Sequence, residues 1–230
     1  MRLLCTIIFF LLQLNDSLFP IGAYAHSFGL ETYVQKNLVY DKKTAQEWIE
    51  QFIKISLLYS SLLPIKLAYN AAKNNDIDKL HQLEEKIFAA KSAFELRIAT
   101  EKLGLRFTKT VKAINPNFDS TLFNKYITTS TKISYPIAYG VITACSDIEL
   151  DMALANFLYA QTSSLVTTCV KIIPLSQTDG QKILFSCHQL FDTVLKQLST
   201  LDETSFCLST PGLDICSMQH ETLYSRLYMS

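Results

Sequence analysis

The sequence predicts an all-α protein, a single helical-bundle-like domain over residues 1–230 with about eight to ten helices. Several segments carry apolar residues at helical spacing, and no alternating run of useful length indicates strands. Only 6 Gly and 6 Pro occur in 230 residues, which argues against a loop-rich or all-β chain. Hydrophobic residues make up 49% of the chain, so a substantial core is expected.

The charge balance and the cysteines indicate which kind of partner and which cellular compartment to expect. The 21 basic and 21 acidic residues cancel, so the chain lacks the basic excess typical of nucleic-acid-binding proteins, and we expect protein partners. No Cys-x-x-Cys pair is present, and Cys169 and Cys187 lie in helical patterns, where free cysteine behaves as a small apolar residue. Reduced thiols and a reducing compartment are therefore expected.

The N-terminus allows two interpretations. Arg2 and the apolar run Leu3–Leu12 have the shape of a signal peptide, and Ala23-Tyr24-Ala25 offers a small-x-small cleavage pattern. Against cleavage, the polar region before that cut would be unusually long. The run is also too short to cross a bilayer, which takes about 20 apolar residues. The alternative is a short buried first helix, and we expect no membrane association.

Residues 15–31, NDSLFPIGAYAHSFGLE, form the most distinctive stretch. Pro20 fixes its own backbone and disfavours helix in the residue before it, and Gly22 permits unusual backbone angles. The stretch predicts a shaped turn that enters a helix near Ser27, which continues to about Asn37. Shaped turns with polar and aromatic side chains are frequent functional surfaces, although an ordinary helix-connecting loop has similar chemistry.

Amphipathic helices follow in the first half of the chain. Asp41 is the expected N-cap of a helix whose apolar face carries Trp48, Phe52 and Ile55. Pro64 is expected to begin another helix, and the turn at 74–78 caps the next one. The charges at Glu84, Glu85 and Lys86 indicate a solvated face.

A longer helix is expected from Ser92 to about Lys112. Gly104 lies inside it and marks either a close approach by another helix or a tolerated weak spot. Residues 115–119 indicate a turn, and Pro136 opens an apolar segment that ends at Ser146-Asp147.

The second half contains the two clearest helical patterns. Glu149 to Ile173 is apolar almost all round in its second half and predicts a central buried helix that ends before Pro174. The next helix carries one continuous apolar stripe, formed by Ile183, Leu184, Cys187, Leu190, Phe191, Val194, Leu195 and Leu198.

The last twenty residues, 211–230, are unusually rich in apolar and aromatic side chains for a chain end. They must either pack on the body of the protein or be kept for a partner, because aromatic residues, Met and Arg are favoured at interface centres. Arg226 offers bidentate contact with a carboxylate.

No enzyme motif is complete. HETLY at 220–224 begins like a zinc-protease motif, but Tyr224 stands where the second histidine ligand is required. The chain has no Gly-x-Ser-x-Gly elbow and no phosphate-binding Gly-rich loop. We therefore expect a protein without catalysis and without a cofactor.

Three separated blocks resemble the urease accessory protein UreF family in the right order. They are DSLFPIGAYAHSFGLE at 16–31, LVTTCVKIIPLSQTDGQKIL at 165–184 and LDICSMQHETLYSRLYMS at 213–230. The segments ELRIATEKLGLRF at 95–107 and YPIAYG at 135–140 are also similar to this family.

This resemblance implies an all-helical, cytoplasmic homodimer that bridges the accessory protein UreD (also called UreH) and the GTPase UreG. The assembly delivers nickel to the urease apoenzyme, and UreF regulates the GTPase step. The resemblance also implies a partner-binding surface. Its residues are Pro20, Gly22, Tyr24, His26, Ser27, Gly29, Glu31, Gln177, Asp179, Gly180, Gln181, His220, Glu221, Tyr224, Ser225 and Arg226.

The chain departs from the family pattern at three of these places. Ala23 and Ser176 replace glycines found in many members, and Gln219 replaces an arginine, which puts in doubt a salt bridge carried at that position. Met1–Phe10 has no counterpart in the pattern. The alternative function is a metallochaperone that holds nickel directly through Cys216, His220 or His26.

Overall fold

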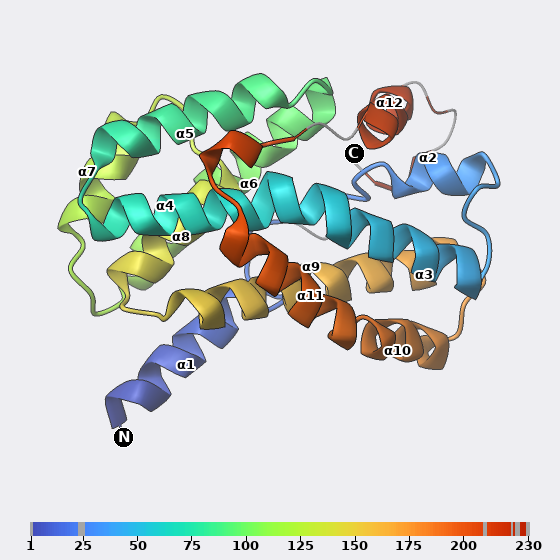
Figure 1. Cartoon of the computed structure of the whole chain (residues 1–230), viewed down its shortest axis with the longest axis horizontal. Coiled ribbons are helices and arrows are strands. Elements are labelled where there is room, and N and C mark those ends of the chain that lie inside the picture. The colour runs from blue at the N-terminus through green and yellow to red at the C-terminus, as the bar shows by residue number, and fades with distance from the viewer. Residues whose placement is uncertain (1, 23–25, 209–210, 222, 224–225, 229–230) are drawn as a thin grey trace.

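A computed structural model of the chain describes residues 2–22, 26–208, 211–221, 223 and 226–228. These residues form helices and no strand, so the all-α prediction is confirmed (Figure 1). The α-helices are α1 (Arg2–Leu14), α2 (Leu30–Gln35), α3 (Lys42–Gln51), α4 (Leu63–Lys73), α5 (Ile77–Ala90), α6 (Phe94–Ile114), α7 (Thr121–Thr129), α8 (Tyr135–Cys145), α9 (Leu150–Ile172), α10 (Gln177–Ser186), α11 (His188–Thr200) and α12 (Pro211–His220). A π-helix at Phe52–Leu62 and a 3₁₀ turn at Glu203–Ser205 complete them.

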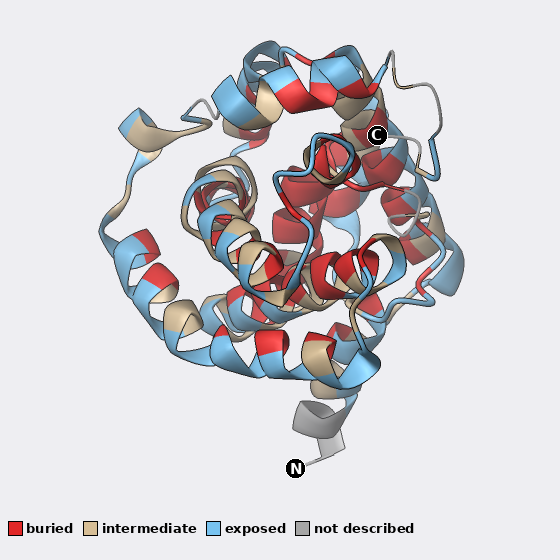
Figure 2. Ribbon diagram, turned by 90° about the vertical axis from the view of Figure 1, so that its right-hand side faces the viewer, coloured by how far each residue is buried: buried red, intermediate tan, exposed pale blue. Residues whose placement is uncertain are grey.

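Helix α1 projects from the helical body, as Figures 1 and 2 both show. Leu11 and Leu14 near its C-terminal end are each 1% exposed, whereas Phe9 is 69% and Leu12 52% exposed. The expectation of a buried first helix therefore holds only for the end that joins the bundle.

The segment Lys42–Lys73 is one continuous helix through α3, the π-helix and α4. Asp41 caps it as predicted, because its carboxylate accepts from the backbone N–H of Thr44 at 2.8 Å. The prediction that Pro64 begins a separate helix is wrong. Pro64 has no N–H, so the π-type bond that another residue here would donate to the carbonyl of Tyr59 is absent, and the N–H of Cys207 donates to that carbonyl at 3.2 Å. The bond from a distant segment compensates the missing donor.

Lys42–Lys73 is also the one helix, among the described residues, that is long and apolar enough to cross a membrane, with a mean hydropathy of 1.3. Forty-four per cent of its apolar window is buried inside the bundle. The core helix of a water-soluble protein has the same composition, so this helix is weak evidence for a membrane span.

Two glycines allow close packing around α8, which lies beside α4 in Figure 1. A Cβ at Gly140 would lie 2.6 Å from the carbonyl oxygen of Ile65 on α4. A Cβ at Gly104 on α6 would lie 2.2 Å from the carbonyl oxygen of Ile133. Gly104 therefore marks a close approach, although the neighbour is the backbone just before α8 rather than another helix.

Two other helix boundaries differ from the predictions. Helix α2 is shorter than expected, because Phe28 and Gly29 have φ of 51° and 83°, and these left-handed angles prevent helix before Leu30. The single helix predicted after Pro174 is two, α10 and α11, divided at Cys187. Beside that division the Ser186 hydroxyl donates to the carbonyl of Ile183 at 2.7 Å, a bond that competes with regular helix.

The prediction that Glu84, Glu85 and Lys86 form a solvated face of α5 is wrong for Glu84. Glu85 and Lys86 are exposed, but Glu84 is only 4% exposed. Its carboxyl group accepts from the Tyr126 hydroxyl, and both its oxygens lie 3.0 Å from the backbone nitrogen of Ser134. Burial raises the pKa of Glu84 to about 7, and the hydrogen bonds from Tyr126 and Ser134 oppose that shift.

Gly104→Ala is expected to lower the free energy of unfolding by about 1–3 kcal/mol, because backbone atoms of residues 133–134 must move away from the added methyl group. Urea denaturation followed by circular dichroism measures the change. Gly212→Ala is the matched control, since its Cβ would meet only Tyr33 at 3.6 Å. Equal stabilities of the two variants would contradict the close approach.

The free energy of unfolding is expected to fall as the pH rises from about 5 to 8, because Glu84 ionises in this range. Its folded-state pKa of about 7 lies above the unfolded value of 4.5, so the native state binds the extra proton and stability falls as pH rises. The loss from this group is on the order of 3 kcal/mol. Glu84→Gln, which keeps an acceptor oxygen for Tyr126 and Ser134, should reduce this pH dependence. An unchanged pH profile of the denaturation midpoint in the variant would refute the assignment.

Candidate functional site

The predicted turn and the predicted tail meet at one place in the fold. Helix α2 follows the turn, and α12 with the residues after it lies against α2, as Figure 1 shows. A Cβ at Gly29 would lie 3.0 Å from the Ser217 hydroxyl oxygen, and the Thr32 hydroxyl donates to the carbonyl of Cys216 at 2.9 Å. Gly29 is therefore required both for its left-handed backbone and for the close approach of α12.

His220 is the centre of this contact. It is fully buried, and its Nε2 lies 3.0 Å from Oε2 of Glu31 while its Nδ1 lies 2.8 Å from Oε2 of Glu95. Each ring nitrogen therefore lies within hydrogen-bonding distance of a carboxyl group, one from α2 and one from α6. His220 joins these two helices through its imidazole ring.

The residues after α12 complete the network. Arg226 donates from Nη1 to Oε1 of Glu95 at 2.8 Å, and its side chain remains 41% exposed. The backbone N–H groups of Leu227 and Tyr228 donate to Glu31 at 2.7 and 3.3 Å. We call Glu31, Glu95, His220 and Arg226 the tail network. Its two acidic side chains are contacted by the imidazole of His220, by the guanidinium of Arg226 and by two backbone N–H groups.

His26 lies in the turn beside this network and is buried, with 8% of its surface exposed. Burial lowers the pKa of His26, and the nearby cations Lys102 and Arg106 lower it further. His26 contacts the ring of Phe28, which in turn contacts Phe52 at a centroid distance of 6.3 Å. These ring contacts connect the turn to the π-helix.

A cavity of about 360 Å³ lies between α2, the long helix and the start of α12. Trp48 and Phe52, stacked at 5.2 Å, form one wall, and Gly212 and Leu213 form the opposite one. The cavity is mostly apolar and partly open to solvent.

The structure places the predicted site residues in two different environments. Those that are buried or fill close contacts are His26, Ser27, Gly29, Glu31, Gly180 and His220. Those that are exposed are Pro20, Gln177, Gln181, Glu221 and Arg226, with Gly22 and Asp179 partly exposed. Tyr24, Tyr224 and Ser225 lie outside the described residues. Buried members support the surface, and the exposed ones are available to a partner.

The residues 177–181 do not join the tail network. They form the start of α10, which Figure 1 shows apart from α12. Ser176, where many relatives have glycine, caps α10 by accepting from the N–H of Asp179 at 3.0 Å. Gly180 packs against α9, because a Cβ there would lie 2.7 Å from Val170.

Sequence reasoning missed Glu95 as a site residue. Glu95 is the first residue of the segment 95–107, whose similarity to the UreF family was the one sequence feature that could have pointed to it. At Gln219 the side-chain oxygen accepts from Lys36, a contact that an arginine at the same position would replace with like-charge repulsion. Cys216 and His220 lie on the same helix, but the described part of the chain holds no group of three or more His, Cys, Asp or Glu side chains arranged to bind a metal ion.

His220→Ala is expected to destabilise the protein by about 3–5 kcal/mol, because Glu31 and Glu95 lose the shared imidazole partner while they remain largely buried. Arg226→Ala should cost about 1 kcal/mol or less, because its partly exposed ion pair is screened by solvent. Chemical denaturation of both variants measures the two costs. Similar costs for the two variants would show that His220 is not the centre of the network.

The comparisons with known proteins agree with this arrangement. The sequence model of the UreF family matches residues 39–188. A urease accessory protein UreF from Lachnoclostridium phytofermentans is 34% identical over 221 residues, which cover 96% of this chain and 97% of that protein. The family model covers the α6 block, and the match to the relative covers nearly the whole chain. The chain therefore belongs to the UreF family of urease accessory proteins.

Proposed function

We propose that this protein is a non-catalytic scaffold of urease maturation. In this proposal it bridges UreD/UreH and the GTPase UreG, and it regulates the GTP-dependent insertion of nickel into the urease apoenzyme. It acts in the cytoplasm as a homodimer. The family assignment supports a role in urease maturation, and the bridging role goes beyond that assignment.

The observation that carries the proposal is the way in which Glu31 and Glu95 hold His220 and Arg226. The residues after His220 are tied down by Glu31 and Glu95, yet Arg226 keeps a large part of its side chain in solvent. A chain end with no role beyond packing has no need of a buried, fully paired histidine to fix it. The arrangement instead presents a guanidinium and the exposed Glu221 in a fixed orientation.

The apolar cavity at the start of α12 supports the proposal as a second element of a protein-binding surface. Its rings Trp48 and Phe52 are of the kind that interface centres favour. Direct nickel binding by Cys216, His220 or His26 is not supported by any arrangement of the described residues. Both ring nitrogens of His220 lie within hydrogen-bonding distance of carboxyl groups, so a metal ion would have to displace one of these contacts.

Arg226→Ala is expected to leave the helical circular dichroism unchanged but to weaken recruitment of UreG by about tenfold or more, because an interface arginine commonly contributes that much. The experiment is co-purification of the full chain with UreD/UreH and UreG, followed by a urease activation assay.

Lys171→Ala is the matched control for this experiment. It removes an exposed cation from α9, outside the predicted site. If Arg226→Ala retains UreG as well as the control does, the tail is not the UreG-binding surface. If the wild-type chain binds neither accessory protein, the scaffold proposal itself is wrong.

A further inference from the structure

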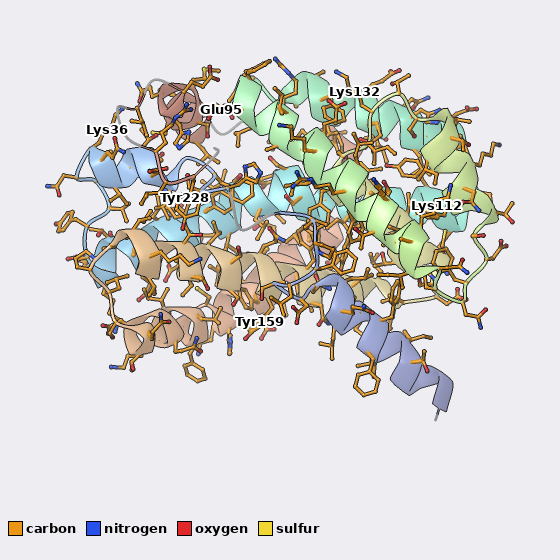
Figure 3. All side chains as sticks on the ribbon, turned by 180° about the vertical axis from the view of Figure 1, so that it is seen from behind. Lys36, Glu95, Lys112, Lys132, Tyr159 and Tyr228 are labelled. Carbon is orange, nitrogen blue, oxygen red and sulfur yellow. The ribbon has the colours of Figure 1, made fainter. Side chains whose placement is uncertain are left out.

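The outward face of α6 carries a row of cations that the proposed function does not use. Lys102, Arg106, Lys109 and Lys112 follow one another at spacings of four, three and three residues, so they share one face of the helix. All four side chains are exposed. We call these four residues the α6 cation row. Figure 3 shows α6 crossing the visible face, with Glu95 near one end and Lys112 near the other.

The cation row has no carboxylate partner within the described residues, since none of its members takes part in a salt bridge there. Some lysines elsewhere are paired: Lys73 with Asp147, and Lys79 and Lys86 with Glu203. Like charges three or four residues apart destabilise a helix by a few tenths of a kcal/mol per pair. Within the described residues, no salt bridge offsets this repulsion along the row.

The cation row is continuous with the turn of the candidate site. Arg106 donates from Nη1 to the carbonyl of Ile21 at 3.4 Å, and it lies so close to Gly22 that a Cβ there would be 2.5 Å from the same nitrogen. Leu105, next to Arg106 on α6, is 47% exposed, and Leu18, three residues before Ile21 in the chain, is 88% exposed. The surface thus combines a line of positive charge with apolar side chains beside it.

We propose that the α6 cation row and the adjoining turn form a docking surface for an acidic protein segment. The row spans ten residues, or about 15 Å along the helix axis. An acidic helix with carboxylates at three- to four-residue spacing matches that length and charge, and an apolar side chain of the same helix would cover Leu18 or Leu105.

A protein segment fits the surface better than a nucleic acid does. The chain has equal numbers of basic and acidic residues, and the row is a single line rather than a broad basic face. This inference rests on the proposed function, because the acidic segment is assigned to one of the accessory proteins that assemble with this chain.

The test compares two triple variants of the full chain. Lys102→Gln/Lys109→Gln/Lys112→Gln removes three charges from the row and keeps Arg106 on the turn. Lys43→Gln/Lys171→Gln/Lys196→Gln removes three exposed charges from α3, α9 and α11. Binding to purified UreD/UreH and, separately, to purified UreG is measured at low and at physiological salt. Vesicles of phosphatidylglycerol and phosphatidylcholine and a 20-mer DNA duplex are the other two probes.

The row variant is expected to bind one accessory protein about tenfold more weakly at low salt and to show a flatter salt dependence, because three screened ion pairs are lost. The control variant should stay within about threefold of wild type, because exposed charges far from an interface contribute little. Circular dichroism confirms that both variants are folded.

Equal binding of the row variant and wild type to both accessory proteins would overturn the docking surface while leaving the scaffold role intact. Row-dependent binding to the vesicles or to the DNA, without an effect on either protein, would also overturn it. Failure of wild type to bind any accessory protein would instead show that the proposed function is wrong, and with it this inference.

Discussion

Two carboxylates that the bundle leaves without partners, Glu31 and Glu95, decide where the end of the chain lies. A largely buried carboxylate is costly unless donors surround it, and Glu31 is only 4% exposed. Its donors come from the imidazole of His220 and from two backbone N–H groups beyond it. Arg226, Leu227 and Tyr228 are therefore held against the body of the protein by contacts with α6 and α2.

This requirement divides the signature residues into a supporting set and a presented set. His220, Ser27 and Gly29 are buried and fix the geometry, whereas Arg226 and Pro20 reach solvent. Such a division is what a preorganised protein-binding surface needs, because side chains that are already held lose less entropy when a partner binds. Both sets are chemically necessary to the surface, although only the exposed set is available to touch another chain.

The sequence predicted the elements whose periodicity was strong and missed those set by tertiary contacts. The Asp41 cap, the α9 helix and the all-α class follow from local pattern. The continuity of the long helix through Pro64 does not, because it depends on a hydrogen bond from Cys207. Glu84 was expected in solvent because it stands among other charges, but Tyr126 and Ser134 enclose it. Glu95 was missed because its partners lie 125 or more residues away in the chain.

Net charge is a poor guide to the surface of this protein. The composition balances at 21 basic and 21 acidic residues and by itself favours partners with neutral surfaces. Within the described residues, Lys43, Lys73, Lys79 and Lys86 on α3, α4 and α5 pair with carboxylates, whereas the α6 cation row forms no salt bridge. The potential near a surface is set by the nearest unpaired charges within about 10 Å, and not by the total. A protein of zero net charge therefore still has a locally positive surface along such a row, which is the physical basis of the proposed docking surface.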